Sequence, residues 1–172
     1  MKNSSLTIFI ALLLILSGCS FSGSFKSAQA PDHIKTFFVE NFYNETPNGP
    51  PTLTLTFTEK TKEYFQRNSK FELVNGLGNA ELQGTITQYN VTPIAPVSGG
   101  TNIEIASQNR LTIGVSIRYT DNIKDENSFT KNFSKFSDFE RTENLSDVED
   151  QLVNEIADLL IIDIFNAAYD NW

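Results

Sequence analysis

The segment 110–120 constrains the fold more than any other part of this sequence. Apolar and polar residues alternate strictly along it, and the apolar positions are Leu111, Ile113, Val115, Ile117 and Tyr119. Successive side chains of a strand point to opposite faces, so the pattern predicts a strand with one buried and one polar face. The chain must therefore build a sheet that other elements cover on one side.

Strand-like patterns also cover residues 34–42, 71–74, 80–92 and 129–139. The first is apolar on both faces, which predicts an interior position. Pro93 and Pro96 are expected to end the segment 80–92, because proline cannot donate to a sheet ladder. The loop 93–107 that follows is long, which is typical of a functional segment, although a plain hairpin tip fits equally well. A bulge is expected before Phe136.

Two segments favour helices. Residues 52–58 alternate as a strand would, but Pro50 and Pro51 suit a helix start, and apolar residues recur there at helical spacing. We predict a helix over 51–67. A second helix is predicted over 146–168, with Ser146 and Glu149 forming a capping box at its start. It is apolar around most of its circumference, so it should be buried on several sides.

These elements predict an α+β fold: two helices packed on a four-stranded, mostly antiparallel sheet, in the order β-α-β-β-β-α. Residues 34–172 are long enough for one domain with its own core. Fourteen phenylalanines beside one tryptophan and one methionine predict that aromatic rings fill much of that core.

The amino terminus has the pattern of an export signal. A short cationic start and an apolar run lead to Leu16-Ser17-Gly18-Cys19, which resembles the bacterial lipobox. The resemblance implies removal of residues 1–18, lipid on the Cys19 sulfur and acylation, by palmitate among others, of the new amino terminus. Ordinary secretion of a soluble product is the alternative. Residues 19–33 are interpreted as a lipidated tether, and Ser20 favours the outer membrane, facing the periplasm.

The composition argues against several classes of function. The formal charge of −8 is a poor match for nucleic acid, whose binding depends on phosphate neutralisation. With one cysteine and one histidine, His33, the chain offers no metal-ligand cluster, and we interpret His33 as a surface residue. No phosphate-cradling glycine motif or nucleophile elbow is present. We expect neither an enzyme nor a cofactor beyond the covalent lipid.

Binding is the remaining chemistry. Arg110 and Arg118 lie on the polar face of their strand, and Lys131 and Lys135 share a face with phenylalanines on the next one. Cations beside aromatic rings suit a phosphorylated amphiphile such as lipopolysaccharide, since arginine binds phosphate bidentately and lysine as a point charge. Ordinary solvated charge is the alternative interpretation.

Five stretches, in order along the chain, resemble the LptE family of lipopolysaccharide-assembly lipoproteins in its Bacteroidetes-type form. They are TFTEKTKEYFQ (56–66), LQGTITQYNVTPIAP (82–96), NRLTIGVSIRYT (109–120), FSKFSDF (133–139) and the segment 145–172. The resemblance implies an outer-membrane lipoprotein that plugs and helps assemble the LptD β-barrel translocon, which delivers lipopolysaccharide to the cell surface. A stand-alone lipid-binding periplasmic lipoprotein is the main alternative, and an anchored hydrolase using His33 a remote one.

Overall fold

The computed structural model describes residues 33–94 and 108–170. The predicted signal peptide, Cys19 and nearly all of the tether lie outside the described residues, as do residues 95–107 of the predicted loop.

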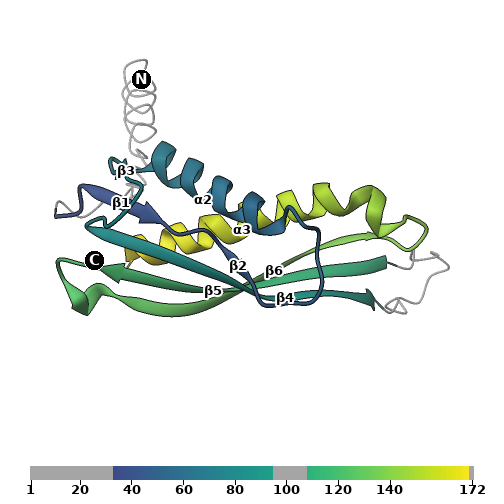
Figure 1. Cartoon of the computed structure of the whole chain (residues 1–172). Coiled ribbons are helices and arrows are strands. Elements are labelled where there is room, and N and C mark those ends of the chain that lie inside the picture. Colours follow the sequence, from purple (N-terminus) through teal and green to yellow (C-terminus); the bar gives the residue numbers. More distant parts are fainter. Residues whose placement is uncertain (1–32, 95–107, 171–172) are drawn as a thin grey trace, which may run out of the picture.

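Two helices lie side by side on one face of a six-stranded sheet, and residues 33–94 and 108–170 place no helix on the other face (Figure 1). The elements in chain order are β1 (Thr36–Val39), β2 (Tyr43–Asn44), α2 (Leu53–Asn68), β3 (Glu72–Leu73), β4 (Ala80–Ile94), β5 (Gln108–Asp121), a 3-10 turn (Asp125–Asn127), β6 (Phe129–Glu140) and α3 (Leu145–Asp170). The α+β class and the two helices are confirmed.

The prediction of four mostly antiparallel strands was wrong in number and in direction. The order is β3-β1-β4-β5-β6, and β2 also pairs with β4. β1 runs parallel to β3 and β4, and β2 runs parallel to β4, whereas β4, β5 and β6 form an antiparallel meander. The parallel pairs arise because α2 is a crossover helix between β1 and β3. β2 and β3 are two residues long, too short to leave a periodic pattern.

The predicted bulge before Phe136 was also wrong. β5 and β6 pair without interruption from Gln108 opposite Glu140 to Tyr119 opposite Phe129. The register shift lies in β4 instead, between Ile86 and Gln88. One extra residue there reverses the alternation, so that Tyr89 joins the buried face of the sheet.

β4 continues through Pro93 to Ile94, beyond its predicted end at residue 92. On the edge of β4 that faces away from β5, the pairing with β2 extends only as far as Ile86. Among the described residues, no strand pairs with β4 beside Pro93 on that edge, and a residue that lacks an N–H is tolerated at such an edge.

The helix predicted over 51–67 is confirmed. Leu53, Phe57, Thr61 and Phe65, each four residues apart, form its buried stripe. The second helix is confirmed as α3, but the predicted capping box is not formed. The Ser146 hydroxyl bonds the Asp147 carboxylate, and Glu149 accepts a hydrogen bond from the Tyr89 hydroxyl at 2.5 Å.

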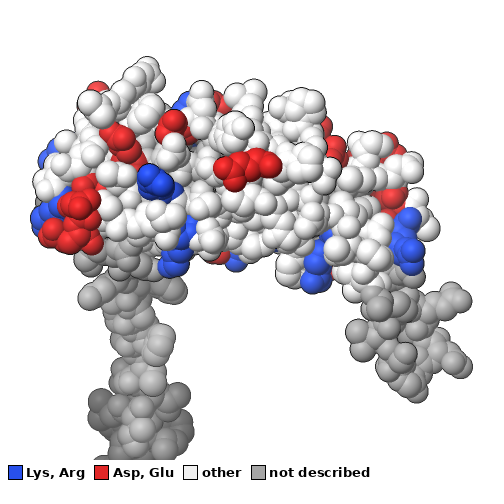
Figure 2. Space-filling view, turned by 60° about the horizontal axis from the view of Figure 1, so that its bottom comes forward, with Lys and Arg blue, Asp and Glu red and all other residues white. Residues whose placement is uncertain are grey.

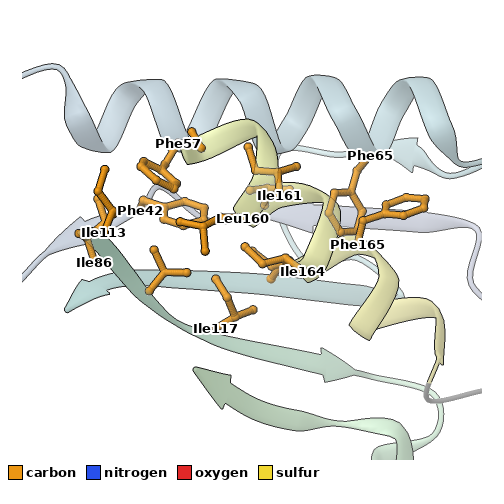
Figure 3. Close-up of a cluster of buried hydrophobic side chains, with 14 of the residues drawn as sticks. Phe42, Phe57, Phe65, Ile86, Ile113, Ile117, Leu160, Ile161, Ile164 and Phe165 are labelled. Carbon is orange, nitrogen blue, oxygen red and sulfur yellow. The ribbon is translucent and has the colours of Figure 1, made fainter. Parts of the chain in front are cut away.

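Aromatic rings fill much of the space between helices and sheet, as the phenylalanine content predicts (Figure 3). Phe37 of β1 stacks on Phe65 of α2 at 4.7 Å between ring centroids, and Phe165 of α3 meets Phe65 edge-on at 5.0 Å. Gly84 of β4 leaves room for the Phe42 ring, which a β-carbon at that position would overlap. The core thus depends on shape as well as on apolar area.

Candidate interaction surface

The register places one set of side chains on the sheet face opposite α2 and α3, here called the open face. Its members belong to three strands and alternate with buried residues. They are Glu81, Gln83, Thr85, Gln88, Asn90 and Thr92 on β4, Gln108, Arg110, Thr112, Ser116, Arg118 and Thr120 on β5, and Thr130, Asn132, Ser134, Phe136, Asp138 and Glu140 on β6. None of them is buried.

The open face is polar and carries little net charge. Hydroxyl and amide side chains predominate, and the five charged groups are three acids and two arginines, so that opposite charges nearly cancel. Figure 2, which turns the sheet side toward the reader, shows wide uncharged areas between scattered charges. This balance is unusual for a chain with a formal charge of −8.

Arg110, Asp138 and Phe136 form a compact group on the open face. The Arg110 guanidinium donates two hydrogen bonds to Asp138, from Nε at 2.7 Å and from Nη2 at 2.9 Å. It also lies 3.5 Å from the centroid of the Phe136 ring. The hydrogen bonds from Arg110 hold the pKa of Asp138 below its ordinary value, and the same pair raises the pKa of Arg110. The guanidinium fork predicted to bind phosphate is thus engaged within the protein.

Arg118 lies on the same face but nearer the other end of β5. It is exposed, pairs in register with Gln83 and Thr130, and has no ion-pair partner within the described residues. Its charge is therefore available to a ligand in a way that the charge of Arg110 is not.

Lys131 and Lys135 lie on the opposite face of β6, in register with buried residues of β5 and toward the helices. The Lys135 ammonium forms an ion pair with Asp163 of α3 at 2.7 Å, and Lys131 lies 5.9 Å from the Phe133 ring centroid. The structure therefore does not gather the four predicted binding cations. Inward-pointing lysines on an edge strand oppose pairing with another chain, which gives them a structural role as well.

The outer surface of α2 and α3, here called the helix layer, has a different charge. α3 carries seven Asp and Glu residues and no Lys or Arg. Lys60 of α2 pairs with Asp158 at 2.6 Å, and Lys135 of β6 neutralises Asp163. The helix layer remains strongly acidic.

His33 is not the plain surface residue that the sequence suggested. Its Nε2 lies 2.8 Å from the Asp121 carboxylate, whose side chain is fully buried. Burial acts to raise the pKa of Asp121, but hydrogen bonds from His33, the Lys124 and Ile123 amides and Asn127 outweigh it and lower the pKa. This group fastens the start of the domain to the β5–β6 hairpin. Its members His33 and Asp121 are 88 residues apart in the sequence, and no sequence motif marks them.

The surface hollows are small and open. Three of them have volumes of about 200, 240 and 300 Å³, and polar or charged side chains contribute to the lining of each. In residues 33–94 and 108–170 no group of three or more His, Cys, Asp or Glu side chains converges as a metal site would. The extended surfaces of the domain are thus its most developed features.

A family of lipopolysaccharide-assembly proteins, LptE, matches residues 34–168. This chain belongs to the LptE family. The match covers both helices almost completely and every strand, including the whole open face. The LptE family consists of non-enzymatic lipoproteins, so membership supports a lipopolysaccharide-assembly lipoprotein of the cell envelope.

Solved structures share the fold at low sequence identity. A protein from Xanthomonas campestris has a TM-score of 0.57 at 8% identity, with 83% of this chain and 90% of that chain covered. A hypothetical protein from Chlamydia trachomatis has a TM-score of 0.54 at 9% identity, with 79% of this chain and 97% of that chain covered. A minor lipoprotein from Acinetobacter baumannii has a TM-score of 0.51 at 14% identity, with 80% of this chain and 94% of that chain covered.

No curated protein matches the sequence. Of the helices formed by the described residues, neither has the length and hydrophobicity required to cross a membrane.

Proposed function

We propose that this LptE-family chain is the lipoprotein subunit that plugs and helps assemble an LptD-like outer-membrane β-barrel, the translocon that delivers lipopolysaccharide to the cell surface. The family match over residues 34–168 carries this proposal. The lipobox-like sequence ending at Cys19 supports it, because lipid on that cysteine would hold the domain at the outer membrane on its periplasmic side.

A subunit with this role needs surfaces rather than a catalytic centre. The described domain has an extended polar sheet face and only small open hollows. The proposed activity is therefore non-enzymatic and requires no cofactor. The rings packed between helices and sheet give less support to a stand-alone lipid carrier, which needs an internal apolar cavity.

Direct contact with lipopolysaccharide is a second part of the proposal. Arg118 and Lys131 have no ion-pair partner within the described residues, whereas Arg110 and Lys135 are paired with Asp138 and Asp163. We expect the two unpaired cations to contribute more to binding of lipid phosphate. Binding of purified lipopolysaccharide should fall more for Arg118→Ala and Lys131→Ala than for Arg110→Ala and Lys135→Ala.

A pull-down tests the main proposal. The full chain, tagged after Trp172, is extracted from outer membranes of its host in mild detergent, and co-purifying proteins are identified by mass spectrometry. Stoichiometric recovery of one large lipopolysaccharide-transport barrel is expected. Recovery of the tagged chain alone, while other barrel complexes stay intact, would contradict the proposal. A Cys19→Ala variant should leave the outer-membrane fraction.

A further inference from the structure

We infer that the open face is the surface by which this domain docks on the inner wall of its barrel partner, whereas the helix layer faces water. The inference rests on the proposed function and adds which of the two faces makes the contact.

The open face carries side chains that are typical of the centre of a protein interface. Such centres are enriched in aromatic residues and arginine. Phe136 is 49% exposed, and Arg110 stacks on it. Tyr43, opposite Thr85 in the register and 65% exposed, adds a second aromatic ring beside the face. Aromatic and arginine side chains are the usual energetic centres of interfaces.

Two of the charged groups of the open face, Arg110 and Asp138, can be covered at low cost. Removing a single charge from water is expensive, but Arg110 and Asp138 already satisfy one another through two hydrogen bonds. The hydroxyl and amide groups around them can both donate and accept. Their natural complement is a neutral, polar surface, and the inner wall of a transmembrane barrel is polar.

The helix layer lacks these properties. Asp147, Asp150 and Glu155 of α3 are exposed and have no ion-pair partner in the described part of the chain. Docking this layer on a neutral wall would strip water from several carboxylates without compensation. The difference in charge between the two surfaces therefore favours the open face as the one that docks on the barrel wall.

Other occupants fit the open face less well. A hydrocarbon surface would leave the hydroxyl and amide groups without partners, and an anionic lipid layer would require more than the two arginines present. A second copy of the chain would place equal residues against one another, and crosslinks between two copies would reveal it.

Two matched double variants of the full-length lipoprotein test the inference. Thr112→Glu with Asn132→Glu places two carboxylates on the open face, and Gln66→Glu with Gln151→Glu places two on the helix layer. Within residues 33–94 and 108–170 none of these four side chains forms a hydrogen bond, so both variants should fold. Thermal melting verifies that they do. The open-face pair should reduce recovery of the barrel at least about tenfold, whereas the helix-layer pair should leave it unchanged.

A photo-crosslinking residue at Ser134 or at Gln66 gives a second measurement that does not depend on introduced charge. Crosslinks to the barrel from Ser134 and not from Gln66 are expected. Unchanged recovery with the open-face pair, or crosslinks from Gln66 alone or from both sites equally, would overturn the inference while the proposed function stands. Crosslinks from Ser134 to a second copy of the chain would also overturn it. Failure of the unaltered protein to recover any barrel would overturn both.

Discussion

The two faces of β5 differ in what they require of their residues. The face toward the helices carries Ile113, Val115 and Ile117, all fully buried, in contact with a tightly packed aromatic core. The open face of the same strand carries Thr112, Ser116 and Arg118, which touch no helix. One face is therefore constrained by volume and the other by polarity. Substitutions should separate the two: changes of size affect stability on the first face, and changes of charge affect association on the second.

The largest loss of stability should follow from a charge placed on the buried side of α3. Ile156 is fully buried, so Ile156→Asp should lower the free energy of unfolding by several kcal/mol, because a carboxylate would lie without a partner in the core. Leu159→Asp on the same helix is the matched control, since Leu159 is 42% exposed and should lose far less. Urea denaturation of the purified protein measures both. Equal losses would mean that the inner and outer sides of α3 do not differ as described.

A change of volume alone should have the next largest effect. In Gly84→Ala the new methyl group would overlap the Phe42 ring, and such overpacking typically costs about 1–3 kcal/mol. Gly76→Ala is the control, because no atom lies within 4 Å of a β-carbon at that position. Thermal melting should show a clear decrease for the first variant and almost none for the second. The contrary result would show that Phe42 can move at little cost.

Asp121 makes a pH-dependent contribution at the end where the chain enters the domain. Its folded-state pKa is lowered, so its stabilising effect is complete above the unfolded value of about 3.9 and is lost as the pH falls through the folded-state value. Asp121→Asn should cost about 1–3 kcal/mol at neutral pH, because buried donors lose a charged acceptor.

The difference between Asp121→Asn and the parent protein should shrink as the pH falls below about 4. Asp125→Asn, in the exposed part of the same hairpin, serves as the control and should show no such convergence. A difference that stays constant across the acid range would exclude Asp121 as the titrating group.

The smallest effect is expected for the ion pair between Lys135 and Asp163. Both side chains are partly exposed, at 36% and 40%, and exposed pairs contribute about 0.2–1 kcal/mol. A double-mutant cycle with Lys135→Ala and Asp163→Ala measures the coupling, which should decrease with added salt. A coupling of several kcal/mol would place this pair in the core rather than at its border.

The sequence predicted those parts of the fold in which periodicity extends over many residues. β5 alternates over more than ten residues and α3 is apolar at helical spacing over most of its length, so both could be predicted with small errors at their ends. In β6 lysines interrupt the alternation on the inner face, and a bulge was predicted where none exists. β2 and β3 could not, because a two-residue strand exists only through its partners. The shift near Gln88 also escaped prediction, since it is apparent only when β4 is aligned with β5.

The candidate site was harder to predict than the fold. The alternation correctly separated Arg110 and Arg118 from the buried face of β5, but it could not show that Asp138, 28 residues away, engages Arg110. The same holds for His33 and Asp121, which are 88 residues apart. Charge partners depend on register between strands, whereas burial depends on pattern within a strand.

The contact between His33 and Asp121 determines at which end of the sheet the chain enters the domain. It therefore also determines how far the opposite end lies from the point of entry. The chain enters the domain beside the β5–β6 hairpin, and fifteen residues of β4 lead away from that end over about 50 Å. A lipid anchor upstream of His33 would attach the sheet to the membrane at this end only. The turn between β6 and α3 would then stand at the far end, a sheet's length from the point of attachment.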